Sequence, residues 1–422
     1  MKSSKFLTIA TIFLVIALDA KAQSTVTLYG IIDEAVVLQS NSRIAAGNAP
    51  TGGYGTGKSK VFLDATSGLS GSRWGLKGTE NLGGGLSVIF QLENGLNLNN
   101  GALGQGGLEF GRQAYVGLND ERLGKITLGR QYDSVVDFIG PLTLATRIGS
   151  SYAAPPGDLY NTSNAQRVNN AIKYTSPRLN GLLFDALYSF GGVSGSMARN
   201  QIYSVGSDFL SGPIRLSAAF LKVNQLNVSF FSNSAIAANT LGTSTTSIST
   251  PVYSGYANAN SYQVAAAGGQ FSTGPVTLSA AYLNAQFRGL GSSLSNAGNG
   301  VPAGKASGNA IFNTLELNVI SFITPALQIG AAYSFTRASS VAGLRDATAR
   351  TSAGSGGANY NQFAISSDYA LSKRTDAYAM ASLQLASGTD STGGKAVAAI
   401  DTLTPSANNR QAVLRVGLRH KF

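Results

Sequence analysis

The sequence contains no cysteine and a single histidine, and both absences limit what the chain can do. Without cysteine, an exported chain has no disulfides, so its rigidity must come from hydrogen bonding and packing. The lone His420 leaves no histidine pair for hydrolytic chemistry, and no group of residues has the spacing of a metal site. We therefore expect no enzyme, no catalytic residue, no metal and no cofactor.

Long apolar runs are also missing. The run Phe6–Leu18 has thirteen residues, fewer than the roughly 20 that a membrane-spanning helix needs. It follows two lysines and precedes an Ala-x-Ala site that ends at Ala22, which is the arrangement of a secretory signal peptide. We expect residues 1–22 to be cleaved off and residues 23–422 to form one domain.

Charge is scarce, and it is unbalanced in sign. Only 12% of the residues are charged and 43% are hydrophobic, whereas soluble domains carry about 25% charged residues. The formal net charge is +11, but the cations are scattered and form no basic run, so we expect no nucleic-acid partner. A closed, hydrogen-bonded barrel would supply the rigidity that disulfides do not.

The last thirteen residues alternate between apolar and polar side chains. Even positions from Ala412 to Phe422 are mostly apolar, whereas Arg415, Arg419 and Lys421 occupy odd positions, where we expect general lumen or rim charges. A period of two predicts a strand with one apolar and one wet face. Its length suits a tilted membrane-spanning strand of roughly 9–11 residues. We expect it to pair with the first strand and leave the sheet without a free edge.

The same alternation recurs upstream. Arg73 and Lys77 share one face of a strand, Trp74 and Leu76 share the other, and the glycine-rich turn Asn81–Gly85 follows. Six further short turns are expected at 119–123, 179–181, 211–213, 272–275, 324–325 and 372–374. Longer polar loops alternate with them, at about 39–67, 97–107, 132–167, 192–199, 226–258, 290–308, 340–357 and 388–408. This order predicts an all-β, antiparallel, sixteen-stranded transmembrane barrel with short periplasmic turns and long extracellular loops.

The third long loop, 132–167, differs from the others in composition. It contains Arg147, several acids, and the apolar residues Phe138, Ile139 and Leu142. A loop of this length with apolar residues of its own is either functional or disordered. Its apolar residues favour a loop that packs against another part of the protein.

Six segments carry a set of motifs in a fixed order. They are 26–33 (VTLYGIID), 72–85 (SRWGLKGTENLGGG), 90–94 (FQLEN), 111–118 (GRQAYVGL), 128–132 (LGRQY) and 417–422 (GLRHKF). Together they resemble the general diffusion porins of Gram-negative bacteria, most closely the beta-proteobacterial branch of the Burkholderia, Bordetella and Neisseria type. The resemblance is sharp over the first 175 residues and the last 15, and architectural between them.

This resemblance implies a homotrimer of sixteen-stranded barrels in the outer membrane, surrounded by lipid and lipopolysaccharide. It implies that the loop 132–167 folds into the lumen and narrows the pore, where wall arginines face loop carboxylates. The arginines at the matching positions are Arg73, Arg112 and Arg167. The loop lacks the Pro-Glu-Phe-Gly-Gly turn of the enteric branch, so Asp133, Asp137 and Asp158 are candidate acids only. Phe422 matches the terminal aromatic residue that closes such barrels and is read by the barrel assembly machinery.

Alternation alone places the three arginines differently. Arg73 lies on the face opposite Trp74, so it should point into the lumen. Arg112 has the parity of Val116, which would face lipid. Either a bulge changes its face or it lies at a subunit contact, whereas the resemblance favours the pore. Arg167 lies where the loop rejoins the wall.

The expected function is passive diffusion of ions and small hydrophilic solutes through a water-filled channel. The three wall arginines face acids that are candidates only, and the net charge of the chain is positive. We therefore expect a mild preference for anions. The alternative is a substrate-specific channel for a sugar or another nutrient, although such barrels often have about eighteen strands and a run of lumen aromatics. A plugged adhesin or structural barrel is a further alternative, and it would lack an open-channel conductance.

Overall fold

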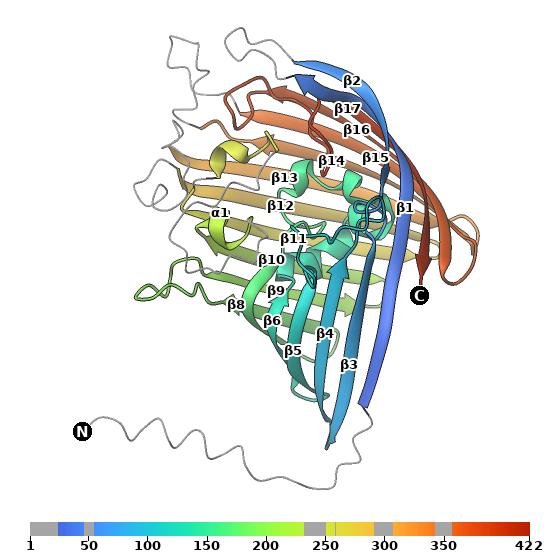
Figure 1. The fold of residues 1–422 in the computed structure, drawn as a ribbon, viewed down its shortest axis with the longest axis vertical. Coiled ribbons are helices and arrows are strands. Elements are labelled where there is room, and N and C mark those ends of the chain that lie inside the picture. Colours follow the sequence, from blue (N-terminus) through green and yellow to red (C-terminus); the bar gives the residue numbers. More distant parts are fainter. Residues whose placement is uncertain (1–23, 46–54, 232–249, 258, 291–306, 342–356) are drawn as a thin grey trace.

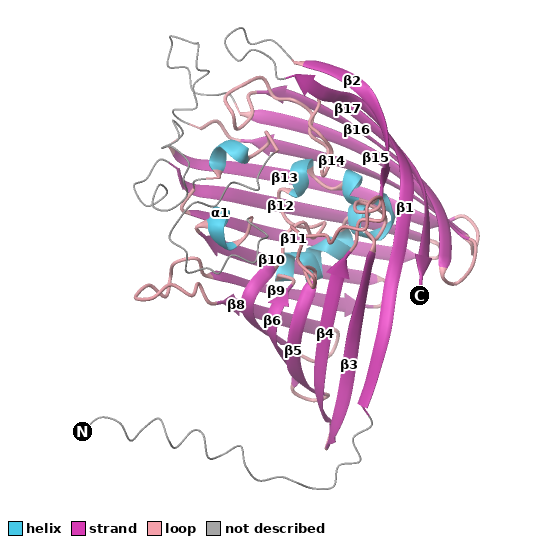
Figure 2. Ribbon diagram, viewed as in Figure 1, coloured by secondary structure: helices cyan, strands magenta, loops and turns pink. Residues whose placement is uncertain are grey.

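The computed structural model describes residues 24–45, 55–231, 250–257, 259–290, 307–341 and 357–422. The expected signal peptide, 1–22, lies outside these residues, as do most of the loops predicted at 290–308 and 340–357 and the middle of 226–258. The described residues form one antiparallel sheet that curls into a barrel, with helical segments in its interior (Figures 1 and 2).

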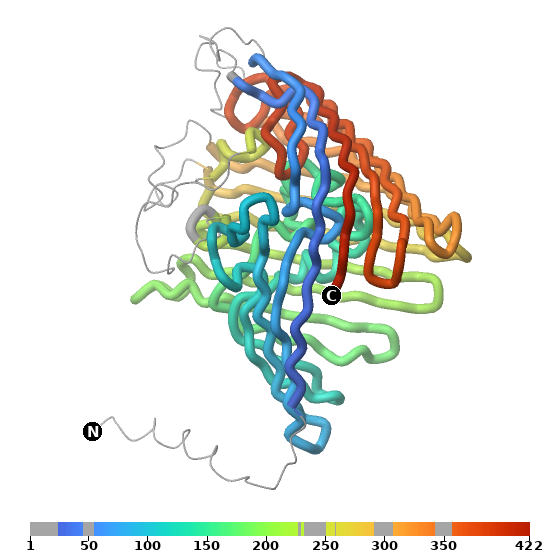
Figure 3. The backbone as a smooth tube through the Cα atoms, turned by 45° about the vertical axis from the view of Figure 1, so that its right-hand side comes forward, coloured from blue at the N-terminus to red at the C-terminus, as the bar shows by residue number. Residues whose placement is uncertain are grey.

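The sheet consists of seventeen strands in chain order, and it closes on itself. The strands are β1 (Ser24–Ala45), β2 (Thr56–Asp64), β3 (Arg73–Gly83), β4 (Leu86–Gly95), β5 (Gln113–Asp120), β6 (Gly124–Gln131), β7 (Val168–Thr175), β8 (Leu182–Ser189), β9 (Ile202–Ser211), β10 (Ile214–Asn224), β11 (Ser261–Thr273), β12 (Val276–Leu290), β13 (Gly308–Phe322), β14 (Leu327–Ala338), β15 (Ala358–Ala370), β16 (Thr375–Gly388) and β17 (Arg410–Lys421). The first and last strands pair with Val37 opposite Arg415. Figure 3 shows β1 in blue beside β17 in red.

Two of the strands, β2 and β3, share one position in the barrel. β2 pairs with β1 from Ala35 to Ala45, and β3 pairs with β1 from Ser24 to Ile31. The segment 65–72, which joins them, leaves the wall. Counted by position, the barrel therefore has sixteen strands, which confirms the number inferred from the alternation.

The loop predicted at 39–67 is wrong in its bounds. β1 continues to Ala45, and β2 returns from Thr56, so most of this stretch is a hairpin. The outward side chains of Val61 and Leu63 are exposed, as lipid-facing residues of a barrel are. The glycine and serine content suggested a loop, but the backbone hydrogen bonds to β1 hold this stretch extended.

The short connections match the sequence predictions. All seven predicted turns join consecutive strands, from the β3–β4 turn to the β15–β16 turn. In the first of them, Gly84 and Gly85 have φ values of 64° and 89°, a region that glycine enters without steric cost. The short turns alternate with the long loops along the chain, so the two kinds of connection lie at opposite ends of the strands.

The closing strand β17 shows the two faces that its alternation predicted. Leu414, Val416 and Leu418 are about half exposed on the outer surface. Arg415 is completely buried and Arg419 nearly so, both on the inner side. The terminal Phe422 exchanges two backbone hydrogen bonds with Gly30 of β1, each 3.1 Å long. The last residue therefore extends the pairing that closes the barrel.

Short helical segments occur in the loops. Five lie between β6 and β7: η2 (Val135–Ile139), η3 (Gly140–Leu142), η4 (Ala145–Gly149), η5 (Ser151–Ala153) and η6 (Pro156–Asp158). The others are α1 (Leu226–Ser229) and η7 (Ser254–Tyr256). None of the helices in the described residues has both the length and the apolar character to cross a membrane.

The third loop, 132–167, crosses the lumen. Phe138, Ile139 and Leu142 are buried, in agreement with the prediction that this loop packs. The wall makes room with glycine: a Cβ added to Gly206 of β9 would lie 2.4 Å from the Phe138 ring. Figure 2 shows its helical turns in cyan inside the barrel.

Hydrogen bonds to distant strands hold the third loop in this position. The Asn318 side chain of β13 donates to the Leu142 carbonyl at 2.8 Å, and the Leu144 amide donates to Glu316, also of β13, at 2.9 Å. The Gln362 side chain of β15 donates to the Tyr152 carbonyl at 3.1 Å. Because β13 and β15 lie far along the barrel from β6 and β7, these contacts span the lumen.

Candidate pore constriction

A cavity of about 590 Å³ lies between the third loop and the adjacent wall. We call it the arginine cavity. Its charged lining residues are Arg73, Arg112, Arg147, Arg167 and Asp401, and the segment 66–71 supplies much of the remaining lining. The three arginines that the sequence singled out thus lie together, and the inward segment between β2 and β3 forms part of the same narrow region.

Two of the wall arginines share one carboxylate. The Arg112 Nε donates to Glu93 Oε1 at 2.6 Å, and Arg73 Nη1 lies 3.9 Å from the same oxygen. The Tyr29 hydroxyl donates to the other oxygen of Glu93 at 2.9 Å. Both carboxylate oxygens of Glu93 therefore accept hydrogen bonds. Its single negative charge offsets only one of the two arginines, Arg73 and Arg112.

The alternation of side chains would place Arg112 toward lipid, whereas the family resemblance places it in the lumen; its position in the structure resolves this conflict. β5 begins at Gln113, so Arg112 precedes the strand and its side chain is not bound by the alternation. Val116 faces outward, as expected, while Arg112 is 9% exposed and turns into the lumen. Neither a bulge nor a subunit contact is needed, because the strand begins one residue later than the pattern suggested.

Arg167 joins the cluster from the end of the third loop. Its guanidinium lies 5.9 Å from the centre of the Tyr132 ring, and its Nη1 donates to the Ala165 carbonyl at 3.0 Å. Burial, together with the nearby Arg112, lowers the pKa of Arg167 to about 9. It therefore remains a cation at neutral pH, although its neighbours repel it.

Two of the three candidate acids are engaged within the loop itself. Asp133 accepts hydrogen bonds from the Val135 amide at 2.8 Å and from the Asn161 side chain at 2.7 Å. Asp158 accepts from the amides of Ser163 and Ala165 at 2.9 and 3.0 Å. Both are almost fully buried, and neither lines the arginine cavity. These hydrogen bonds indicate that Asp133 and Asp158 stabilise the loop.

The third candidate, Asp137, lies in a different place. It pairs with Lys173 of β7, which also lies 3.0 Å from Asp185 of β8. These residues line a second cavity of about 440 Å³, the mixed-charge cavity. Its charged lining residues are Lys125, Asp137, Lys173, Arg178, Asp185, Asp208 and Arg215. Here each of the three carboxylates is paired with a cation, so Asp137 does not face the arginine cluster.

Sequence reasoning missed three residues of this region. Glu93 lies in the FQLEN motif and shares the parity of Gln91, so the alternation could have placed it in the lumen. Arg147 was recognised as part of the loop but not as a lining residue. Asp401 comes from the eighth long loop, and no sequence signal links it to the cavity; burial and the nearby Asp158 raise its pKa well above the usual range.

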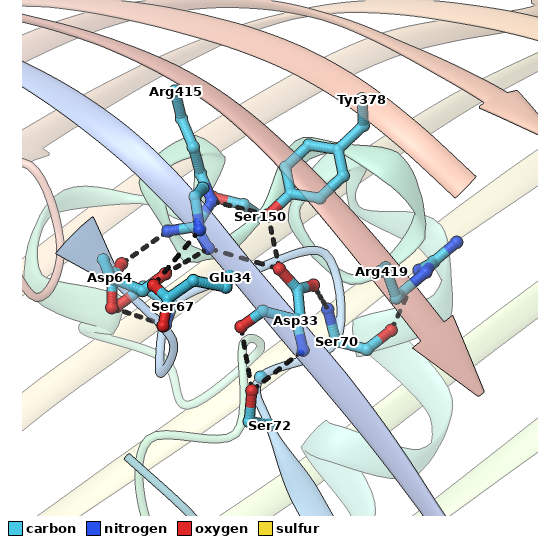
Figure 4. A network of polar contacts seen from close by, with 12 residues as sticks. Asp33, Glu34, Asp64, Ser67, Ser70, Ser72, Ser150, Tyr378, Arg415 and Arg419 are labelled. Atoms are coloured by element: carbon cyan, nitrogen blue, oxygen red, sulfur yellow. Dashed lines mark hydrogen bonds and ion pairs between the residues drawn. The ribbon is translucent and has the colours of Figure 1, made fainter. Parts of the chain in front are cut away.

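The Arg415 side chain was expected to be a general lumen or rim charge; it lies on the inner side of the wall, but it is buried in a network of ion pairs. It is completely buried, with Nη1 2.5 Å from Asp64 Oδ2 and Nη2 3.3 Å from Asp33 Oδ1. Its Nε donates to the Tyr378 hydroxyl at 2.8 Å (Figure 4). The Tyr152 hydroxyl of the third loop donates to the same Asp64 oxygen at 2.6 Å. This Arg415 network therefore fastens the third loop to β1, β2, β16 and β17.

Comparison with known proteins agrees with this architecture. Residues 8–389 match the family model described as Gram-negative porin. An outer membrane porin of Bordetella pertussis is 32% identical over 222 residues, which are 49% of this chain and 56% of that protein. The match thus spans little more than half the length of this relative.

Solved structures extend the likeness to the whole barrel. The anion-selective porin from Comamonas acidovorans superposes with a TM-score of 0.65 at 21% identity, over 95% of this chain and 100% of that one. A trimer form of an outer membrane protein of Vibrio cholerae gives 0.57 at 14% identity, over 94% and 99%. At these identities the structures establish the fold.

The fold places this chain in the class of outer-membrane β-barrels whose third loop lies in the lumen. By the family match, the chain belongs to the Gram-negative porin family. Its relatives place it in the outer membrane. Within the described residues, no group of three or more His, Asp or Glu side chains is arranged to hold a metal ion.

Proposed function

We propose that this protein is a general diffusion porin, a water-filled channel for ions and small hydrophilic solutes with a preference for anions. The observation that carries the proposal is the arginine cavity, where four guanidinium groups and one carboxyl group line the space beside the third loop. The sixteen-strand barrel and the family match support a channel.

The anion preference follows from fixed charge in a narrow wet space. Glu93 offsets one of the wall arginines, and burial favours the neutral form of Asp401, so a positive excess remains. A unit charge about 5 Å away in water stabilises an anion by ~0.8 kcal/mol, which changes its local population about fourfold. More distant loop charges are screened beyond about 8 Å at physiological salt. The lining therefore dominates the selectivity.

The same proposal covers the assembly of the channel. We propose a homotrimer, as the trimer form of the Vibrio cholerae protein supports. Lipid and lipopolysaccharide would surround the exposed apolar side chains of the barrel's outer face. The closing strand, ending in Phe422, is the proposed signal for the barrel assembly machinery, because its backbone makes the last contacts with β1.

Single-channel conductance of the refolded protein in a planar bilayer, with the reversal potential in a salt gradient, tests this function. We expect conductance in steps of three and a reversal potential that favours chloride over potassium. A preference for potassium would contradict the charge argument and leave the channel intact. A folded barrel without conductance would contradict the diffusion channel. Conductance that one sugar blocks at low concentration would favour the substrate-specific alternative.

A further inference from the structure

Arg147 occupies an unusual place among the residues of the arginine cavity. It lies in η4, at the centre of the third loop, whereas Arg73 and Arg112 belong to the wall. All three line the same space. The loop thus contributes two cations, Arg147 at its centre and Arg167 at its end, to a cavity whose wall is already cationic.

The Arg147 guanidinium forms no ion pair with a described residue. Its Nη1 is enclosed and has no hydrogen-bond partner among the described residues, and the same holds for Nε of Arg167. By contrast, Arg112 pairs with Glu93, Arg73 donates to the Gly71 carbonyl at 3.1 Å, and Arg167 donates to the Ala165 carbonyl. A buried donor without a partner is costly, so this arginine is held in place by the packing of the loop around it.

That packing is firm on both sides of Arg147. Leu144, Ala145 and Ile148 are buried against the wall. A Cβ added to Gly330 of β14 would lie 2.8 Å from both Leu144 and Ile148. The backbone of η4 is therefore fixed, and Arg147 is directed away from the wall that its neighbours contact, toward the cavity that it lines.

No carboxylate of the loop opposes the wall arginines. Asp133 and Asp158 are turned inward and hydrogen-bonded within the loop, and Asp137 pairs with Lys173 in the mixed-charge cavity. Burial lowers the pKa of Arg147, and the positive charge of Arg215 lowers it further. Arg215 lines the mixed-charge cavity. Arg147 therefore lies between the arginine cavity and a further cation.

We propose that Arg147 is a specificity-determining residue, which makes the loop side of the constriction cationic like the wall side. The inference rests on the proposed channel function and names the solute class that it favours: small solutes of net negative charge. Opposed acids and bases would create a transverse field that orients dipolar solutes, including zwitterions. With cations on both sides that field is weak, and the potential instead concentrates anions.

The test compares Arg147→Gln and Arg147→Glu with the unmodified channel. The matched control for Arg147→Glu is Arg122→Glu, which makes the same change from a positive to a negative charge at an exposed turn between β5 and β6. We expect the chloride-to-potassium permeability ratio, from reversal potentials in KCl gradients, to fall about sixteenfold in Arg147→Gln. One unit charge about 5 Å away in water changes the local population of an ion about fourfold, and it does so in opposite directions for chloride and potassium. Arg147→Glu should lower the ratio by roughly the square of the factor expected for Arg147→Gln, whereas the control should leave it unchanged.

The outcomes separate this inference from the channel function. If the unmodified protein conducts and prefers chloride, but both Arg147 variants keep its permeability ratio, the inference is overturned and the porin function stands. If the unmodified protein does not conduct, the function itself fails. Heat-induced unfolding on gels checks that the variants are folded, and we expect no loss of stability because the guanidinium gives up no ion pair.

Discussion

Two of the charged clusters in the lumen use the arginine side chain in opposite ways. In the Arg415 network, one completely buried guanidinium contacts two carboxylates, Asp33 and Asp64, and the hydroxyl of Tyr378. In the arginine cavity, four guanidiniums share the region with Glu93 and Asp401. The first cluster has an excess of negative partners and the second an excess of positive charge.

This difference shows how charge is divided between structure and transport. A buried charge must be paired, because its desolvation costs several kcal/mol; Arg415 is paired, and it ties the third loop to the barrel through Tyr152. A charge beside water can stay unpaired and create a potential that ions sense. We infer that the Arg415 network positions the loop so that the arginine cavity, with its excess of positive charge, can select solutes.

The largest expected effect comes from removing the cation of the paired cluster. Arg415→Met leaves Asp33 and Asp64 buried without their common partner, which should destabilise the barrel by about 3–5 kcal/mol. It should also loosen the third loop, because Arg415 holds Asp64, the carboxylate to which Tyr152 of the loop donates. Urea unfolding of the refolded protein in detergent measures the first effect, and the noise of the open single channel reports the second.

A triple variant sharpens this test. Arg415→Met combined with Asp33→Asn and Asp64→Asn removes the stranded charges, and neutral replacement of a buried ion cluster is often tolerated. We expect it to be more stable than Arg415→Met alone. If the single variant were as stable as the unmodified protein, the network would not be the structural element that the geometry suggests.

A smaller effect on stability, together with an effect on selectivity, is expected in the arginine cavity. Arg73→Gln leaves Glu93 paired with Arg112, so the free energy of unfolding should change by no more than about 1 kcal/mol. The chloride-to-potassium permeability ratio should nevertheless fall about sixteenfold, because one charge at about 5 Å changes the populations of the two ions about fourfold each, in opposite directions. Arg374→Gln, at an exposed turn, is the control. A large loss of stability with unchanged selectivity would reverse the roles that we assign to the two clusters.

The sequence predicted the barrel well because alternation is a local property of each strand. The number of strands, the seven turns and the outward face of β17 all follow from side chains that change sides every second residue. The same logic placed Arg73 correctly on the lumen side, and it failed at Arg112 only because the strand begins at Gln113. A one-residue error in a strand boundary is enough to invert the face of the residue beside it.

The clusters themselves could not be predicted, because they join residues that are far apart in the chain. Arg415 contacts Asp33 and Asp64 across more than 350 positions, and Asp401 reaches the cavity from the eighth loop. The acids of the third loop showed the same limit. Composition revealed Asp133 and Asp158, but only the folded loop shows that their oxygens accept backbone hydrogen bonds rather than face the pore.

The smallest expected effect concerns the pH response of the third loop. Burial raises the pKa of Asp158 from 3.8 to about 7, although three donors favour its charged form. Between about pH 4 and about pH 7, Asp158 is therefore protonated in the folded loop and ionised in the unfolded loop. The stability of the folded loop is then highest at low pH and declines as the pH rises through this range. Hydrogen exchange of the Ser163 and Ala165 amides, corrected for intrinsic rates, should show stronger protection at pH 5 than at pH 8.

Two variants decide whether Asp158 causes this response. Asp158→Asn cannot ionise but keeps an oxygen that accepts hydrogen bonds, so the protection should no longer change between pH 6 and pH 8. Below pH 6 a weaker dependence should persist, because burial also raises the pKa of Asp133 to about 6. Asp120→Asn, at the end of β5 and away from the third loop, should behave like the unmodified protein. Protection that increased from pH 5 to pH 8 would mean that the amide donors of Ser163 and Ala165 outweigh the cost of burying the charge.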